Sequence, residues 1–332
     1  MEQHAIIIII VILALTFDFI NGFHDTANAI ATSISTKALP PKMAIALAAI
    51  MNLVGALTFT GVAKTVGGKV ADPMHIQHGT YVVAAALVAA IAWNLFTWYY
   101  GIPSSSSHAL IGSLAGSVIA AAGFGAVNFA GFVTIIEALI FSPLLAFTVG
   151  YVVMTLIRYI FGSFSPHKLN SRFRLLQILT AAIQSFSHGT NDAQKTMGII
   201  TFALVAGGFQ STLDVPYWVK LSAALAMAFG TSIGGWKIIK TVGTKIIKFE
   251  PASGFASDIS SAIVIFGATL IKMPVSTTHV ISSAIMGVGS AKRFSAVKWD
   301  TAITMVTAWV ITLPVTMVLA AISFTLVKLI FL

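Results

Sequence analysis

The sequence contains no cysteine and few charged residues. Asp, Glu, Lys and Arg make up 9 % of the 332 residues, whereas a soluble domain carries about 25 %. The lack of cysteine excludes disulfides, thiolate metal sites and cysteine nucleophiles. Hydrophobic residues make up 57 % of the chain, and the mean hydropathy is +0.94. So apolar a chain cannot cover a core with polar surface, and the composition therefore predicts an integral membrane protein embedded in the lipid bilayer.

Long apolar runs recur along the whole chain. They cover residues 5–17, 43–62, 82–93, 132–157, 262–271 and 302–330. A helix needs about 20 mostly apolar residues to cross the hydrocarbon, and the strand alternation typical of an outer-membrane barrel is missing. The expected fold class is an all-α integral membrane protein. The first run is interpreted as a retained membrane helix, because Glu2 but no basic residue precedes it and the helical pattern continues past Ala29.

Basic residues lie in the short loops between the apolar runs. The loop residues are Lys37, Lys42, Arg158, Lys168, Arg172, Arg174, Lys237, Lys240, Lys245, Lys248, Lys292, Arg293 and Lys298. Because cytoplasmic loops are enriched in Lys and Arg, this distribution predicts a multi-pass protein of the cell membrane with residues 158–174 inside and both termini extracytoplasmic. Solvated loops account for the net charge of +9, so no nucleic-acid partner is expected.

Three motifs occur twice in the same order. Residues 21–28 (Asn-Gly-Phe-His-Asp-Thr-Ala-Asn) resemble 188–195 (His-Gly-Thr-Asn-Asp-Ala-Gln-Lys), Lys-Thr-Val-Gly at 64–67 recurs at 240–243, and the Pro-Ser-rich segment 103–108 recurs at 274–279. Three motifs that recur in the same order predict that the chain arose by an internal duplication. Residues 1–157 would form the first membrane repeat, 158–174 a basic cytoplasmic linker, and 175–332 the second repeat.

The charge distribution predicts that the two repeats are inverted in the membrane. It places residues 64–67 outside and their copy, 240–243, inside. Inverted repeats are common in secondary transporters, whose broken helices meet near the bilayer midplane. Each repeat must then cross an odd number of times, which follows if 82–121 and 258–289 are re-entrant hairpins with the Pro-Ser-rich turns at their tips.

Polar residues form a stripe along one face of the first predicted helix. They are Asp18, Asn21, Asp25, Asn28 and Thr32, spaced three or four apart as one helical face requires. The second copy carries Asn191 and Asp192. Carboxylates inside a membrane are costly and mark ion or proton pathways, although they can also merely tie helices together. We predict that Asp25 and Asp192, with Asn21, Asn28 and Asn191, couple a cation or proton, and that both aspartates hold the metal if the cation is Na⁺.

Hydroxyl residues follow the proline in each predicted hairpin turn. They are Ser104, Ser105, Ser106 and Ser107 in the first repeat and Ser276, Thr277 and Thr278 in the second. A helix that opens there presents unpaired N–H groups and the positive end of its dipole, which together form an anion site. The alternative is a pair of ordinary capped turns. Lys195 either binds the same anion or neutralises Asp192.

Several other polar residues remain ambiguous from the sequence. The histidines at 24, 108, 188 and 279 are either proton-responsive or structural. Glu137 and Asp258 either relay protons or tie helices, and Lys220 and Lys272 are expected to extend toward the membrane interface.

The duplicated aspartate motif resembles that of a known family. Gly22-Phe-His-Asp-Thr-Ala-Asn-Ala29 and Gly189-Thr-Asn-Asp-Ala-Gln-Lys195 are similar to the duplicated Gly-Ala-Asn-Asp-x-Ala-Asn signature of the inorganic phosphate transporter (PiT) family. The resemblance covers residues 17–309 and extends to the Pro-Ser-rich turns. His24 departs from the signature, as do Gln194 and Lys195, and the short central loop resembles that of bacterial members.

The resemblance implies a secondary active transporter. It would import inorganic phosphate by symport with Na⁺ or H⁺, with alternating access between the repeats. It implies that Asp25, Asn28 and Asp192 belong to the phosphate and cation sites, and that the hydroxyl turns line the phosphate. Because sulfate permeases also occur in this family, sulfate remains an alternative substrate. A homodimer is left open.

Other classes of protein fit the residues less well. Gly67-Gly-Lys69 is followed by Val70 rather than Ser or Thr, so the motif is not a P-loop. A catalytic nucleophile is needed once, whereas the candidate groups occur in both repeats, so we expect neither an enzyme nor a cofactor. An anion channel would use the same hydroxyls, but intramembrane carboxylates repel anions and favour coupling to a cation.

Overall fold

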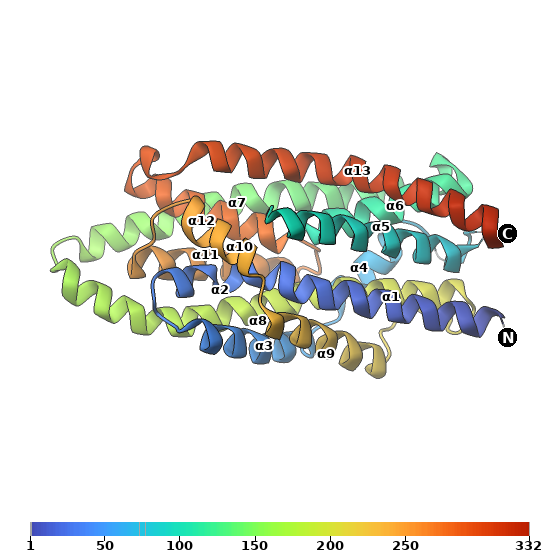
Figure 1. Ribbon diagram of the computed structural model, residues 1–332, viewed down its shortest axis with the longest axis horizontal. Helices are drawn as coiled ribbons and strands as arrows, with labels where there is room; N and C mark the ends of the chain where they lie inside the picture. Colours follow the sequence, from blue (N-terminus) through green and yellow to red (C-terminus); the bar gives the residue numbers. More distant parts are fainter. Residues whose placement is uncertain (1, 73, 77, 332) are drawn as a thin grey trace.

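The computed structural model describes residues 2–72, 74–76 and 78–331, and these form helices joined by short loops (Figure 1). The first half contains α1 (Glu2–His24), α2 (Thr26–Ser35), α3 (Pro41–Ala56), α4 (Gly61–Lys69), α5 (Gly79–Tyr100), α6 (Ser106–Ala122), the 3₁₀ turn η1 (Phe124–Ala126) and α7 (Phe129–Phe161). The second half contains α8 (Pro166–Ala206), α9 (Tyr217–Ile233), α10 (Trp236–Lys245), α11 (Pro251–Leu270), α12 (Thr277–Lys292), η2 (Phe294–Ala296) and α13 (Trp299–Phe331). The predicted all-α fold class is confirmed.

The order of elements repeats between the two halves. α1 and α2 together correspond to the single long helix α8, and α3–α7 correspond to α9–α13. In Figure 1, α1 and α8 run in opposite directions along the long axis, as do α7 and α13. The two halves therefore have inverted topology. The predicted linker 158–174 is mostly helical, because α7 ends at Phe161 and α8 begins at Pro166.

Each half contains a helical hairpin with its tip inside the molecule. Figure 1 shows α5 and α6 in the half of the bundle that holds both termini, and α11 and α12 toward the opposite half. The turn after α5 begins at Gly101 with φ 66°, and the turn after α11 passes through Lys272 with φ 61°. A left-handed residue lets the chain leave a helix abruptly. The second hairpin makes the same turn with lysine, a residue for which this conformation is strained.

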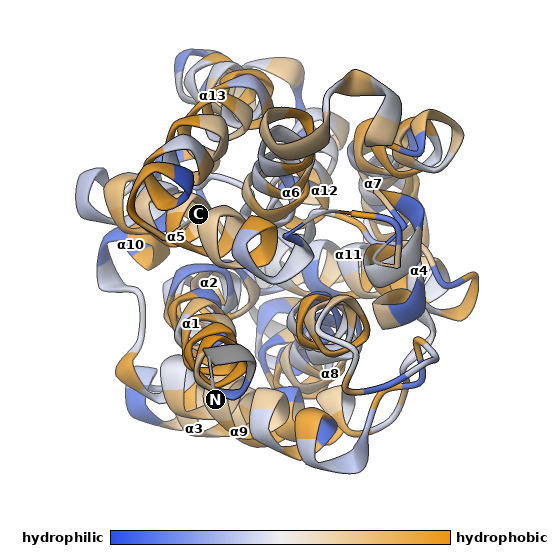
Figure 2. Cartoon of the chain, turned by 90° about the vertical axis from the view of Figure 1, so that its right-hand side faces the viewer, coloured by the Kyte–Doolittle hydropathy of each residue, from blue (hydrophilic) through white to orange (hydrophobic). Residues whose placement is uncertain are grey.

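Apolar side chains cover the outside of the bundle. Within the described residues, five segments are long and apolar enough to cross a membrane: 4–35, α5, α7, α11 and α13. α3 and α4, bent by 71° at their junction, would make a sixth span. Figure 2, a view along the long axis, shows hydrophobic residues distributed around the outer helices. α8 carries a buried polar face instead, because other helices surround its central part.

Glycines allow the two halves to interlock closely. A Cβ at Gly116 in α6 would lie 2.1 Å from the carbonyl oxygen of Met317 in α13, and one at Gly287 in α12 would lie 2.0 Å from that of Phe147 in α7. Small residues of this kind let membrane helices approach at backbone distance. Each hairpin helix is thus held by the last long helix of the other half.

Candidate functional site

The two hairpin tips meet in the interior of the molecule. The Ser107 hydroxyl, at the start of α6, donates to the carbonyl oxygen of Val275, just before α12, over 3.0 Å. The His108 and His279 rings lie 4.6 Å apart between their centroids. Ser105 and Ser276 cap the two helices, accepting from the N–H of His108 (3.1 Å) and of His279 (3.3 Å). Two helix N-termini therefore converge at one place, as the paired turns predict.

Asp25 lies between α1 and α2, beside both tips. Its carboxylate accepts hydrogen bonds from Ser106 of its own repeat and from Thr278 of the other repeat, the latter over 2.9 Å. The Ser106 hydroxyl also lies 2.7 Å from Asn21 Oδ1, and Asn28 Nδ2 donates to Thr278 Oγ1 over 2.9 Å. All of these side chains are buried. The structure thus brings together Asn21, Asp25 and Asn28 of the predicted stripe with one hydroxyl from each hairpin.

Asp192 occupies the equivalent place on α8. Thr277 of its own repeat donates to its carboxylate over 2.8 Å, and His188 Nε2 lies 3.1 Å away. Lys195 forms an ion pair with Asp192 and also donates to Ser107 Oγ (2.6 Å) and to the carbonyl oxygen of Val275 (2.8 Å). The Lys195 side chain is 2 % exposed. Of the two roles predicted for Lys195, neutralising Asp192 is the one this conformation shows.

The two carboxylates have matching environments across the inverted repeat. Each is bonded to a hydroxyl at the tip of its own hairpin, Ser106 or Thr277. Each is also connected to the other hairpin, Asp25 directly through Thr278 and Asp192 through Lys195 and Ser107. Where the first repeat places an amide at Asn28, the second places an ammonium group, and this is the main chemical asymmetry of the cluster.

The remaining predicted hydroxyls have other partners. Ser104 Oγ lies 3.0 Å from Thr312 Oγ1 and accepts from Trp93 Nε1 over 3.2 Å, and Ser105 and Ser276 act as the caps described above. These three therefore support the tips, whereas Ser106, Ser107, Thr277 and Thr278 contact the charged groups.

The Asn191 side chain holds the second hairpin, mainly through backbone groups of the turn. Its Nδ2 donates to Thr269 Oγ1 (3.1 Å) and to the carbonyl oxygen of Met273 (3.2 Å), and its Oδ1 accepts from the N–H of Val275 (3.2 Å). His24 has the matching place in the first repeat, where its Nε2 lies 3.1 Å from Thr97 Oγ1. Both residues adjoin an aspartate and connect it to the helix that precedes the tip.

A third buried carboxylate lies away from the tips. Asp258 of α11 accepts from Thr32 (2.6 Å), Thr180 (3.4 Å) and Gln177 (3.5 Å). These three polar neighbours are uncharged. The sequence singled out Asp258 and Thr32 but missed Gln177 and Thr180, whose spacing of three on one face of α8 was the available signal.

Asp18 is a fourth carboxylate in the interior. It is fully buried, and neither of its oxygens has a hydrogen-bond partner among the described residues. It lies on the same face of α1 as Asp25, two turns nearer the N-terminus. The predicted stripe is thus acidic both at the tips and beyond them.

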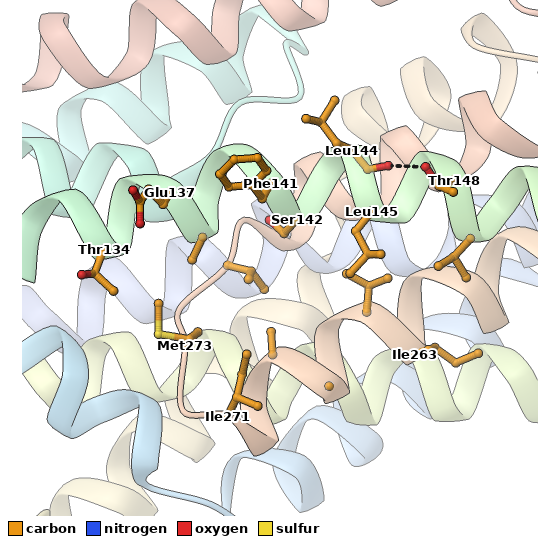
Figure 3. Close-up of a pocket in the computed structure, with 16 residues that line it drawn as sticks. Thr134, Glu137, Phe141, Ser142, Leu144, Leu145, Thr148, Ile263, Ile271 and Met273 are labelled. Carbon is orange, nitrogen blue, oxygen red and sulfur yellow. Dashed lines mark hydrogen bonds between the residues drawn. The ribbon is translucent and has the colours of Figure 1, made fainter.

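A cavity of about 810 Å³ between α7 and α11 reaches the edge of this cluster at Val275 (Figure 3). Its wall is mainly apolar, with Phe141, Leu144 and Leu145 on one side and Ile263 and Ile271 on the other. Its hydroxyl residues, Thr134, Ser142 and Thr148, all lie on α7, and the hydroxyls of Thr134 and Thr148 donate to carbonyl oxygens of the same helix. The polar cluster at the hairpin tips is therefore the candidate site.

This arrangement suits an oxyanion together with a cation. The N–H groups of Ser106, Ser107, Thr277 and Thr278 belong to the first turns of α6 and α12, where backbone donors lack intrahelical acceptors. With both aspartates and Lys195 ionised, the cluster carries one net negative charge. This charge would repel an anion that arrived alone.

Comparison with known proteins assigns the chain to a family. Residues 21–320 match the model of the phosphate transporter family, which covers both aspartates and both hairpins. The chain belongs to this family. It is 59 % identical to a probable low-affinity inorganic phosphate transporter of Bacillus subtilis over 98 % of both chains. It is 44 % identical to a protein of the same description from Rhizobium meliloti, over 95 % of this chain and 94 % of that one.

A solved structure shares the fold of this phosphate transporter family member. It is described as the sodium-dependent phosphate transporter and matches with a TM-score of 0.92 and 24 % identity, over 98 % of this chain and all of that chain. The relatives are transporters, which confirms the expectation of a multi-pass membrane transporter rather than an enzyme. The predicted family is likewise confirmed.

Proposed function

We propose that this protein imports inorganic phosphate by symport with a monovalent cation, and that phosphate binds between the tips of α6 and α12. The observation that carries the proposal is the convergence of two helix N-termini and four hydroxyls on two buried carboxylates. The names of the relatives support phosphate as the substrate. Sulfate stays the alternative only through the family resemblance, since no contact in the site favours it.

Phosphate would bind by replacing contacts that the tips now make with each other. Ser107 and Thr278 each bridge the two repeats, through Val275 and Asp25 respectively. An oxyanion placed there would accept hydrogen bonds from these hydroxyls and from the adjacent N–H groups. Lys195, already bonded to Ser107, would contact the same anion with little movement.

The carboxylates give the site a preference for phosphate over sulfate. At neutral pH phosphate still carries a proton, which it can donate to Asp25 or Asp192, whereas sulfate carries none. A buried acceptor left unpaired disfavours the ligand that cannot satisfy it. The same carboxylates provide the oxygen ligands of a Na⁺ ion or the acceptor of a coupled proton. Asp258, with its hydroxyl and amide neighbours, is a second place where a cation or proton would neutralise a buried charge.

The proposal is tested by radiolabelled phosphate uptake into proteoliposomes of the purified protein. Sodium and proton gradients are imposed separately, and sulfate is added as a competitor. Concentrative uptake driven by one gradient and resistant to sulfate is the expected result, and it identifies the cation. Equilibration of phosphate that ignores both gradients would contradict symport and favour a channel. Uptake of sulfate in place of phosphate would keep the mechanism but change the substrate.

A further inference from the structure

A second cavity, of about 710 Å³, lies where α7 ends and α8 begins. In Figure 1 this is the end of the bundle opposite the two termini. Its wall is formed by the last turns of α7, the loop and first turn that follow, the start of α11 and the end of α12. It therefore borders both repeats, and it is remote from the hairpin tips.

Charged side chains in this cavity leave one positive charge without a counter-ion. Lys292 pairs with Glu250, with 2.8 Å between Nζ and Oε2, so these two charges offset each other. Arg158 donates from one terminal nitrogen to the carbonyl oxygens of Ala291 (2.5 Å) and Lys292 (3.2 Å) at the end of α12. No acidic side chain contacts its guanidinium among the described residues. Since guanidinium carries five N–H donors, three remain for a ligand.

The same cavity has an apolar wall beside its polar one. Met154 and Ile157 are buried in it, and Phe161 and Phe164 complete the wall, Phe164 with 51 % of its surface exposed. α7 qualifies as a membrane span over Phe129–Phe161, so Arg158 stands in the last turn of a span, at the membrane surface. The cavity thus combines an apolar wall and a polar wall at the end of a helix that is long and apolar enough to span a membrane.

We infer that this cavity binds one anionic phospholipid. Its phosphodiester pairs with the free face of the Arg158 guanidinium, and an acyl chain lies along Met154, Phe161 and Phe164. A phosphodiester monoanion matches the single unpaired charge, and planar guanidinium suits two phosphate oxygens at once. Basic pockets between helices at the membrane surface bind anionic headgroups in this way. A free phosphate ion would leave the apolar wall in contact with water, so the lipid is the better occupant.

The bound lipid joins parts of the two repeats. Arg158 lies in α7, the last helix of the first half, and the carbonyl groups that it contacts lie at the end of α12 in the second half. A phosphodiester on its free face holds the guanidinium in this position. We therefore expect an anionic lipid to raise the thermal stability of the purified protein, whatever the protein transports.

Native mass spectrometry of the detergent-solubilised protein tests the inference. Phosphatidylglycerol and phosphatidylethanolamine are titrated separately. The wild type is expected to bind one phosphatidylglycerol with a clear preference over phosphatidylethanolamine. Arg158→Ala is expected to weaken this binding by about tenfold or more, because charge-assisted hydrogen bonds are lost. Lys248→Ala removes the same charge from the loop before α11, outside the cavity, and is expected to leave the affinity unchanged.

A second variant covers the case in which Arg158→Ala disturbs the end of α12. Phe164→Ser alters only the exposed part of the apolar wall and is also expected to weaken phosphatidylglycerol binding. Equal binding of the two lipids by the wild type, or equal affinities of Arg158→Ala and Lys248→Ala, would overturn the proposal. Displacement of the lipid by millimolar inorganic phosphate would show that the cavity recognises a free anion and would also overturn it.

Discussion

At the scale of single residues, the central feature is the pair of buried aspartates. Both are bonded to hairpin hydroxyls, but only Asp192 has a lysine as partner. Asp25 is bonded to neutral groups and to His24, whose Nδ1 lies 2.7 Å from Oδ1. Because no lysine or arginine pairs with Asp25, we predict that it is the carboxylate that takes part in cation coupling.

We predict that Asp25→Asn strongly reduces gradient-driven uptake while the protein still folds. An amide preserves the shape of the side chain but neither binds Na⁺ as an anion nor accepts a proton. A hydrogen bond to a charged group contributes about 1.5–3 kcal/mol, so uptake should fall by about ten- to a hundredfold. Asp214→Asn, in an exposed loop, is the control for loss of one acidic charge. Undiminished concentrative uptake by Asp25→Asn in proteoliposomes would remove Asp25 from the mechanism.

The Lys195–Asp192 pair leads to a prediction about stability. Lys195→Asn makes the second repeat resemble the first but leaves the Asp192 carboxylate buried and unpaired. Removing one partner of a buried ion pair costs about 3–5 kcal/mol. We expect a large loss of thermal stability in detergent, and partial recovery when Asp192→Asn is added.

Thermal unfolding of the two single variants and the double variant measures this coupling. If the loss of thermal stability in the double variant equals the sum of the losses in the two single variants, the two side chains do not interact and the ion pair contributes nothing. Phosphate uptake by the double variant is expected to stay low in either case, because Asp192 is also a candidate ligand.

At the scale of elements, the hairpins depend on close contact with the long helices. Gly287 of α12 faces the backbone of Phe147 in α7, and Gly116 of α6 faces that of Met317 in α13. Backbone atoms cannot be displaced as side chains can. The position of each tip is thus set by a helix of the other repeat.

We predict that Gly287→Ala destabilises the protein. The added methyl group would overlap a carbonyl group, and overpacking of this kind costs about 1–3 kcal/mol. Gly267→Ala is the matched control, because a Cβ at Gly267 of α11 meets no atom within 4 Å. The measurement is the midpoint of thermal unfolding in detergent. Equal midpoints for the two variants would show that α12 and α7 separate easily.

At the scale of the whole molecule, inverted topology determines how the site would open. The two hairpins enter from opposite ends of the bundle (Figure 1), so moving one repeat against the other would expose the tips to one side at a time. The basic segment 158–174, around the junction of α7 and α8, lies at the end away from the termini (Figure 1). From the charge distribution we predict that this end faces the cytoplasm.

This orientation is testable because the chain has no cysteine. Ser163→Cys, in the loop between α7 and α8, should react in intact cells only with a membrane-permeant maleimide. Ser211→Cys, in the loop between α8 and α9, should react with an impermeant one. Both positions are exposed, so accessibility alone does not separate them. The reverse labelling pattern would place the termini in the cytoplasm and contradict the prediction.

The sequence by itself determined the membrane class, the duplication, its inversion, and the fact that Asp25 and Asp192 occupy equivalent positions in the two repeats. These follow from composition and periodicity, which act along the chain and need no knowledge of contacts. It also located the helix starts at the tips, because proline and hydroxyl residues act locally.

Only the tertiary structure decided which hydroxyl meets which carboxylate. Ser104 bonds to Trp93 and Thr312, whereas Ser106, two residues later, meets Asp25. The direction of each side chain depends on how α6 is seated against α13 and α1, and that depends on contacts between residues roughly 80–250 positions apart. The sequence could not predict the partners of Asp258 for the same reason. Its partners come from α2 and α8, and no local pattern shows that these helices meet.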